Sequence, residues 1–271
     1  MKVAISSCLA AEPCALSLTY KEIGKHGYME PAPSNLGLYQ AIYTEAAEEM
    51  GCELSIHRYP KKRTHLLLQS GDIDLYPSTG FDEKRSAYLF YIPNGLHRYE
   101  PYFGLTPSDV SDLGSIPGIN DAALTWIFED GNTTVKKALD FNVRYEEISN
   151  LTDGRAIEML SIGRRVFYRI IERDYERYLS KIMKNDLSHL NIKTHWNCCE
   201  PKSQSLYVGI SRASNIIEEE TNPSYDPNQA LSAENFPTRL STESVAHKLA
   251  KTLDTMRQTG RVNKLFKQYI K

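Results

Sequence analysis

The stretch YPKKRTHLLLQSGDIDLYPSTGFDEKR, residues 59–85, decides how the fold of this chain is interpreted. It joins a basic cluster, a Leu-rich run, a tight turn at residues 70–74 and a group of small polar residues that leads to Arg85. The Leu-rich run predicts a short helix that ends at Gly71, because glycine readily adopts the left-handed conformation that closes a helix. A strand is predicted directly after the turn, so helix and strand follow each other closely, as in an α/β protein.

Strand and helix signals alternate on both sides of this stretch. Asp82 is expected to cap a helix, since side-chain oxygens at that position accept the free backbone N–H groups. The predicted elements are strand 2–7, helix 38–51, strand 52–59, helix 63–71, strand 72–77, helix 82–90, strand 123–131, helix 133–141, strand 165–171, helix 172–183, strand 205–211 and two closing helices that meet at Gly260. This order predicts an α/β fold with parallel strands and covering helices. Residues 104–118 are expected to be loop or crossover, and residues 218–237 a surface excursion.

Composition excludes several classes of protein. The chain has 271 residues, 41% of them hydrophobic and 24% charged, with a net charge of −2. These values are ordinary for a globular protein and provide no general field that would recruit nucleic acid. No apolar run approaches the roughly 20 residues that span a bilayer. The first 14 residues do not resemble a signal peptide, so the chain is either cytosolic or the mature form of a secreted protein.

The five cysteines show no metal-binding spacing. Two interpretations stay open: buried or incidental thiols, or one disulfide formed in an oxidising compartment. The segment HWNCCE, residues 195–200, brings His195 close to Cys198 and Cys199. Two adjacent cysteines rarely face one metal ion, so we expect no metal site, and no cofactor is indicated.

Three segments resemble the type 2 periplasmic solute-binding proteins of amino-acid transporters, also called extracellular solute-binding family 3. Residues 59–85 are similar to the family's basic segment, Leu-rich helix, Gly-x-x-Asp turn and helix start with Arg. The segment DGNTTVKKAL, residues 130–139, resembles the Gly-Thr-Thr helix start of the second lobe. The segment LAKTLDTMRQTGRVNKLFKQYI, residues 249–270, is similar to the closing pair of helices around a glycine.

The resemblance implies a two-lobed fold with a central ligand cleft and two crossover strands. Lobe 1 would comprise residues 1–104 plus 206–271, and lobe 2 residues 105–205. The implied function is extracytoplasmic, non-enzymatic capture of a small polar, carboxylate-bearing ligand, an amino acid or a related compound, by lobe closure. The implied partner is the membrane permease of an ABC transporter, and a periplasmic monomer whose signal segment has been removed is expected.

The resemblance also places ligand-binding residues, with Arg85 as the anchor because a planar guanidinium binds a carboxylate through two hydrogen bonds. The expected set is Arg85, Ser78, Thr79, Gly80, Arg63, Lys61, Thr133, Thr134, Tyr39 and Tyr102. Each has a structural alternative. Arg85 could pair with Asp82 on the surface, the two threonines could only cap a helix, and the basic residues could form a solvated charge run. The tyrosines could belong to the core.

The departures from the family bear on the ligand. Acids that hold an α-ammonium group in the family are replaced here by Tyr39 and Ile171, with Glu172 next to the latter. A buried ammonium without a partner is costly, so an ordinary α-amino acid does not follow from the resemblance. A cleft that contains Lys61, Arg63, Arg85 and Arg169 favours an anionic or multi-carboxylate ligand.

Two other functions stay open. The same fold serves as a ligand-sensing domain in signalling systems, and it hosts a few enzymes. The absence of a nucleophile motif or of metal spacing in the sequence favours binding over catalysis.

Overall fold

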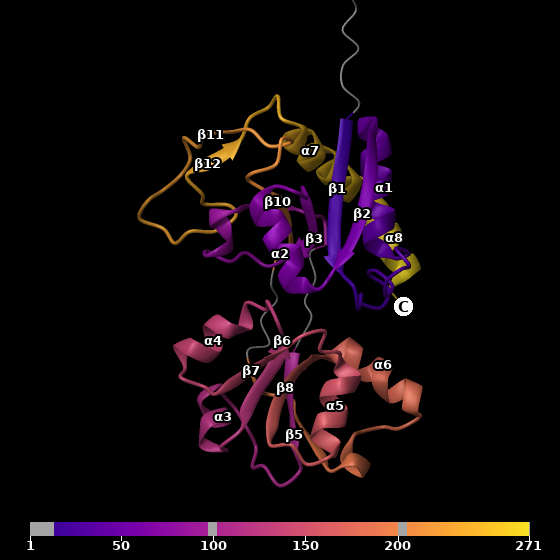
Figure 1. Cartoon of the computed structure of the whole chain (residues 1–271), viewed down its shortest axis with the longest axis vertical. Coiled ribbons are helices and arrows are strands. Elements are labelled where there is room, and N and C mark those ends of the chain that lie inside the picture. The colour runs from indigo at the N-terminus through magenta and orange to yellow at the C-terminus, as the bar shows by residue number, and fades with distance from the viewer. Residues whose placement is uncertain (1–13, 97–101, 200–204, 271) are drawn as a thin grey trace, which may run out of the picture.

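A computed structural model describes residues 14–96, 102–199 and 205–270, and it shows two α/β lobes, one above the other in Figure 1. Each lobe is built on one five-stranded mixed sheet. The chain passes from the first sheet to the second between β4 and β5, and it returns between β9 and β10. The two-lobed, doubly connected α/β fold is therefore confirmed.

The first lobe contains both the N-terminal and the C-terminal described residues. Its sheet has the strand order β2-β1-β3-β10-β4, in which β1 pairs in parallel with β2 and β3, and β10 is antiparallel to β3 and β4. The elements are β1 (Cys14–Lys21), α1 (Leu38–Met50), β2 (Cys52–Tyr59), α2 (Lys61–Ser70), β3 (Leu75–Thr79), the 3-10 helix η1 (Arg85–Ala87), β4 (Leu89–Pro93), β10 (Tyr207–Ser211), α7 (Val245–Gln258) and α8 (Arg261–Tyr269). A separate pair, β11 (Glu219–Thr221) and β12 (Thr238–Leu240), lies in the surface excursion.

The second lobe has the strand order β7-β6-β8-β5-β9. Strand β6 is parallel to β7 and β8, and β5 is antiparallel to β8 and β9. The elements are β5 (Tyr102–Pro107), α3 (Pro117–Asp121), β6 (Thr125–Glu129), α4 (Thr134–Asp140), β7 (Tyr145–Ile148), α5 (Asp153–Ser161), β8 (Val166–Ile171), α6 (Glu172–Ile182), the 3-10 helix η2 (Ser188–Leu190) and β9 (Ile192–His195). The predicted division of the chain at residue 104 falls inside β5, and the exact lobe boundaries stay a prediction.

Local sequence signals explain several element ends. Helix α2 ends at Gly71, whose φ is 82°, and a Cβ there would lie 2.6 Å from the carbonyl oxygen of Ala213. Only glycine satisfies both conditions. Ser244 caps α7 by accepting the backbone N–H of His247. The predicted ends of α1 and α2 at glycines are confirmed.

One prediction about the first lobe is wrong, and another falls on residues that the structure does not describe. The predicted helix over residues 82–90 is wrong: Asp82 does cap a turn by accepting the Arg85 N–H at 2.9 Å, but only η1 follows. Leu89 and Phe90 belong instead to β4, where they pair with β10 and are buried. Tertiary pairing therefore overrides the local helix signal. The predicted strand 2–7 lies outside the described residues, and β1 was not predicted.

Each lobe has its own hydrophobic core, which leaves the space between the sheets to polar groups. In the first lobe, α1, α7 and α8 pack against one another and bury Leu38, Leu249 and Leu253 completely. In the second lobe, Ile127 and Phe167 are fully buried between the sheet and its helices. In the part of the chain that the structure describes, no helix combines the length and the apolar character required to cross a bilayer.

Candidate functional site

A cavity of about 450 Å3 lies between the two lobes and is lined by residues of both sheets. Strands β1, β3 and β6 end at this cavity, and Lys21, Thr79 and Glu129 are their last residues. The carboxyl ends of strands are where open α/β sheets bind ligands, because the loops that follow can carry polar groups. The volume falls within the range of roughly 300–1,000 Å3 that is typical of small-molecule sites.

The structure brings together all of the predicted ligand-binding residues except Arg63. The predicted residues that line the cavity, together with others, are Tyr39, Lys61, Ser78, Thr79, Gly80, Arg85, Tyr102, Thr133 and Thr134. Arg63 is exposed, and its guanidinium carbon lies 4.8 Å from the ring centroid of Tyr59. Helix α2 begins at Lys61, so residues 61 and 63 lie on different faces of the first turn.

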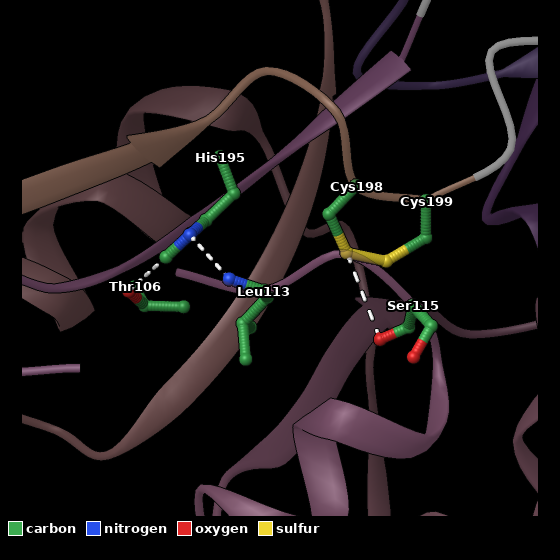
Figure 2. Close-up of a disulfide and its surroundings, with 6 residues drawn as sticks. All are labelled: Thr106, Leu113, Ser115, His195, Cys198 and Cys199. Carbon is green, nitrogen blue, oxygen red and sulfur yellow. Dashed lines mark hydrogen bonds between the residues drawn. A yellow bond between two sulfur atoms is a disulfide. The ribbon is translucent and has the colours of Figure 1, made fainter. Parts of the chain in front are cut away.

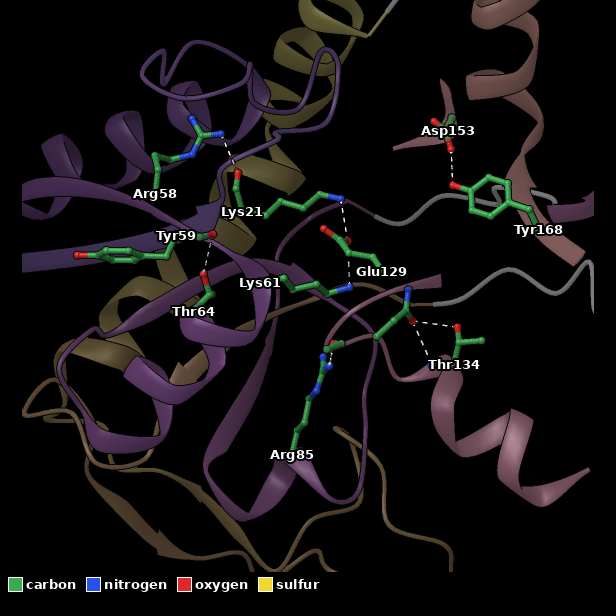
Figure 3. Close-up of polar contacts among 12 residues, drawn as sticks. Lys21, Arg58, Tyr59, Lys61, Thr64, Arg85, Glu129, Thr134, Asp153 and Tyr168 are labelled. Carbon is green, nitrogen blue, oxygen red and sulfur yellow. Dashed lines mark hydrogen bonds and ion pairs between the residues drawn. The ribbon is translucent and has the colours of Figure 1, made fainter. Parts of the chain in front are cut away.

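Lys61 and Lys21 of the first lobe share one carboxylate oxygen of Glu129 in the second lobe (Figure 3). The Nζ–Oε2 distances are 3.1 Å for Lys21 and 3.4 Å for Lys61. All three side chains are at least four-fifths buried, and the second carboxylate oxygen of Glu129 has no hydrogen-bond partner. Burial, opposed by Glu129, lowers the pKa of Lys61 to about 8. We call these three residues the Glu129 cluster; it joins the lobes and contains an acid that the sequence did not point to.

Arg85 also reaches across the cavity. Its guanidinium donates a hydrogen bond of 2.6 Å to the backbone carbonyl of Gly131, in the loop between β6 and α4 (Figure 3). The acid next to it in sequence, Asp82, accepts the backbone N–H of Arg85 and not its guanidinium. A carbonyl neutralises no charge, so the positive charge of Arg85 stays available to an anion.

The threonines of the second lobe are partly engaged within their own turn. The backbone N–H and the hydroxyl of Thr134 both donate to the side-chain oxygen of Asn132, at 3.0 Å and 2.9 Å. Asn132 therefore fulfils the local capping role, and the Thr134 hydroxyl proton is already used. Helix α4 has only seven residues, so we ascribe no anion site to its N-terminus.

The second lobe contributes two further acids. Asp153 begins α5 and accepts a hydrogen bond of 2.7 Å from the hydroxyl of Tyr168 (Figure 3). Burial raises the pKa of Asp153. Asp174 accepts a hydrogen bond of 2.8 Å from Arg177, one turn further along α6. The resemblance aligned Ile171, with Glu172 next to it, with an acid of the family; Ile171 lines the cavity, and the acids of this lobe's wall include Asp153 and Asp174. The helix-start position of Asp153 was a signal that could have identified it.

Aromatic rings form much of the remaining wall. Tyr39 is 4% exposed, and its ring centroid lies 5.2 Å from the centroids of both Tyr20 and Tyr28. Burial raises the pKa of Tyr39 well above its ordinary value. The guanidinium of Arg169 lies over the ring of Tyr102, with its central carbon 4.4 Å from the ring centroid. Tyr39 thus belongs to the core of the first lobe as well as to the cavity wall, whereas Tyr102 is half-buried and belongs to the wall.

The four cysteines in the described part of the chain form two disulfides. Cys14 and Cys52 join the first residues of β1 and β2, which are directly paired. Cys198 and Cys199 are bonded to each other at the end of the second lobe, with the Cys198 sulfur 3.9 Å from the carbonyl oxygen of Ser115 (Figure 2). The sequence left two interpretations open, incidental thiols or one disulfide. The structure shows disulfide formation, with two bonds where one was considered.

The neighbouring His195 has a structural role. Its Nδ1 accepts the backbone N–H of Leu113 at 3.1 Å, so Nε2 carries the proton and donates to the Thr106 hydroxyl at 2.7 Å (Figure 2). Burial lowers the pKa of His195, which favours this neutral form. Across residues 14–96, 102–199 and 205–270, no group of three or more potential metal ligands comes together.

Comparison with known proteins gives structural likeness without sequence likeness. No protein-family model matches the chain, and no curated protein sequence matches it. A Streptococcus mutans structure that concerns glutathione import via GshT and the cystine ABC importer TcyBC has a TM-score of 0.66 at 16% identity, covering 95% of both chains. An ancestral arginine-binding protein bound to arginine has a TM-score of 0.64 at 13% identity, covering 95% of this chain and 98% of its own.

A histidine kinase sensor domain with similarity to periplasmic binding proteins has a TM-score of 0.61 at 11% identity, covering 96% of both chains. At such low sequence identity, the structural likeness establishes the fold and nothing beyond it. The near-complete coverage in both directions means that both lobes and both connections are shared. The chain therefore has the two-lobed fold of the type 2 periplasmic solute-binding proteins.

Proposed function

We propose that the protein captures a small polar, carboxylate-bearing solute between its lobes and delivers it to the membrane permease of an ABC transporter. The observation that supports this most strongly is the cavity itself, which draws polar side chains from both lobes and is bridged by the Glu129 cluster. A ligand that contacts both lobes favours the closed form by its differential affinity for it. Several proteins of the same fold bind amino acids for such transporters.

The charges in the cavity support an anionic ligand group. Lys21 and Lys61 of the first lobe pair with one acid of the second lobe, Glu129, and the Arg85 guanidinium pairs with a carbonyl. The other two acids of the cavity, Asp153 and Asp174, accept hydrogen bonds from Tyr168 and Arg177, so no carboxylate among the described residues pairs with Arg85 and positive charge is left over beside it. A ligand carboxylate would compensate it, with Arg85 as the bidentate partner. Ser78, Thr79 and Gly80 line the cavity next to this charge and would add hydroxyl and backbone contacts.

A carboxylate-binding role is tested by a thermal-shift screen followed by calorimetry. Amino acids, dicarboxylates, small peptides and polyamines are screened on the wild type, on Arg85→Ala and on Arg63→Ala as the matched exposed control. A specific ligand raises the melting temperature by mass action, and the shift grows with the logarithm of the ligand concentration once that exceeds the dissociation constant. We expect Arg85→Ala to weaken binding of a carboxylate ligand about tenfold or more, since charge-assisted hydrogen bonds are lost, while Arg63→Ala binds within about twofold of the wild type. An Arg85→Ala protein that binds like the wild type would refute the anchor role.

We propose reversible binding without turnover, as an extracytoplasmic monomer. The Cys14–Cys52 disulfide supports an oxidising compartment, where such bonds persist. Incubating the identified ligand with the protein and following both by NMR tests this proposal. Conversion of the ligand into a new compound would show an enzyme on the same fold, the less favoured alternative.

A second candidate function is a ligand-sensing domain. The likeness to a histidine kinase sensor domain favours it, because the same closure could drive a switch. Uptake of labelled ligand by cells with and without the gene separates the two functions. Loss of uptake on deletion supports transport, whereas unchanged uptake with an altered transcriptional response supports sensing.

A further inference from the structure

Arg169 lines the cavity but takes no part in the Glu129 cluster. It lies in β8, directly opposite Gly104 of β5, and it lines the cavity from the second lobe. Gly104 has no side chain, and a Cβ there would lie 2.3 Å from the ring of Phe167, two residues before Arg169 on the same face of β8. The small residue lets the Phe167 ring cross to the neighbouring strand, and room remains beside it for the guanidinium.

The guanidinium of Arg169 rests on rings from both neighbouring strands. Its central carbon lies 4.4 Å from the centroid of Tyr102 in β5 and 5.8 Å from the centroid of Trp126 in β6. Trp126 is in turn held edge-on by Phe167, with centroids 5.5 Å apart. Aromatic faces attract the guanidinium through the ring quadrupole but accept none of its charge, so the rings hold Arg169 in place without neutralising it.

No acid in the described part of the chain pairs with the Arg169 charge. Among the residues that the structure describes, no hydrogen bond or ion pair joins the Arg169 guanidinium to another group. Burial lowers the pKa of Arg169, and burial together with the charge of Arg169 lowers the pKa of Lys137 in α4. Arg169 is half-buried, and a guanidinium withdrawn from water is normally paired, because desolvating the charge is costly.

The acids of the cavity are already engaged elsewhere. Glu129 accepts from Lys21 and Lys61, and Asp174 accepts from Arg177. Asp153 accepts from the neutral hydroxyl of Tyr168. Two guanidiniums, Arg85 in the first lobe and Arg169 in the second, are therefore left without a carboxylate partner within residues 14–96, 102–199 and 205–270.

Resting on the proposed function, we propose that the ligand carries two separate carboxylates, one bound by Arg85 and the other by Arg169. Each arginine belongs to a different lobe, so a dianion of matching length bridges them and stabilises the closed form more than a single carboxylate can. A ligand with one carboxylate leaves one buried guanidinium unpaired in the closed cavity. A site with buried polar groups rejects a ligand that cannot pair them, and this makes the dianion preference a source of specificity.

The proposal is tested by calorimetry with matched ligand pairs. The series runs from succinate to pimelate, with glutamate added, and each compound is compared with its own monoamide, which has nearly the same shape and one charge fewer. The proteins are the wild type, Arg169→Gln and Arg164→Gln. Arg164 is an exposed arginine of the same lobe, paired with Glu146, and serves as the control for the same substitution.

We expect the wild type and Arg164→Gln to bind one of the dicarboxylates about tenfold or more tightly than its monoamide. We expect Arg169→Gln to bind the two within about threefold of each other. A wild type that binds monoamides as tightly as dicarboxylates would refute the proposal and leave solute binding intact. A dianion preference that persists in Arg169→Gln would also refute the role of Arg169.

A wild type that binds nothing in this panel or in the wider screen would contradict the proposed function together with this inference. The wild-type comparison of each acid with its monoamide needs no variant, so it decides the question even if Arg169→Gln fails to fold.

Discussion

Lys61 is the residue whose charge responds to pH near neutrality. Its pKa is about 8 because burial opposes the charged form, while Glu129 supports it. The ammonium is present at pH 7 and is lost as the pH rises through 8, so an anionic ligand should bind fully below about pH 7 and more weakly above 8. A bound anion raises the pKa of Lys61, and the loss of affinity is therefore at most about tenfold per pH unit. Calorimetry between pH 6 and 10, values chosen to bracket this pKa by about two units, measures the profile.

Lys61→Arg is the matched variant for this profile, since arginine stays charged across the whole range. We expect its affinity to differ from the wild type at pH 7 but to change little between pH 7 and 9, about one unit either side of the wild-type pKa. An equally steep loss of affinity in Lys61→Arg would assign the titration to another group.

At the residue scale the sequence predicted the first lobe's share of the cavity better than the second lobe's. Lys61, the 78–80 segment and Arg85 lie within one continuous stretch, so a single pattern located all of them. Glu129 and Asp153 belong to separate βα turns that meet the cavity only through the strand order of the second sheet. No local pattern reports such a meeting, and Arg63 shows the converse, because it matches the pattern and lies outside the cavity.

Arg58 acts at the scale of an element, because it holds the loop between β1 and α1. Its guanidinium donates to the backbone carbonyls of Lys21, Glu22, Glu30 and Ser34 and to the side chain of Asn35. Residues 23–26 and Tyr28 of this loop line the cavity. One side chain in β2 therefore fixes a wall of the site that has little regular secondary structure of its own.

Arg58→Met keeps the side-chain length and removes these donors. We expect it to lower the free energy of unfolding by about 2–4 kcal/mol, because several buried carbonyls lose their partner. Hydrogen exchange should increase first in residues 22–37. Arg239→Met, at an exposed arginine paired with Glu220, is the control and should change stability by less than about 0.5 kcal/mol. Uniform exchange changes across both lobes in Arg58→Met would argue against a local role.

Elements with strong periodicity were predictable, and those set by pairing were not. The helices that end at Gly51 and Gly71 carry their stop signal in the sequence. Strand β4 follows a cap at Asp82 that is typical of a helix, and only pairing with β10, from more than 100 residues later in the chain, makes it a strand. Strand β1, CALSLTYK, has an apolar and polar alternation too short and irregular to identify it from the sequence.

At the scale of the whole molecule, charges that belong to different lobes hold the two sheets together around the cavity. The Glu129 cluster and the Arg85–Gly131 hydrogen bond cross the cavity on the side of α2 and α4. The cation of Arg173 in α6 lies 5.1 Å from the ring centroid of Tyr28 in the first lobe, which is a second contact between the lobes. Closure therefore depends on a few polar contacts, and such an interface opens and closes readily.

Glu129→Gln tests this view of closure. The substitution keeps the shape of the side chain but removes the carboxylate that Lys21 and Lys61 share, so these two cations repel each other across a short distance. We expect the open form to gain about 1–3 kcal/mol relative to the closed form, roughly a tenfold to hundredfold shift in their ratio. Small-angle X-ray scattering of the ligand-free variant should give a larger radius of gyration than that of the wild type. Adding a dicarboxylate should reverse the difference, because the ligand supplies the missing negative charge. Glu146→Gln, which removes an exposed pair within the second lobe, should scatter like the wild type. A Glu129→Gln protein as compact as the wild type without ligand would mean that packing, and not the Glu129 cluster, keeps the lobes together.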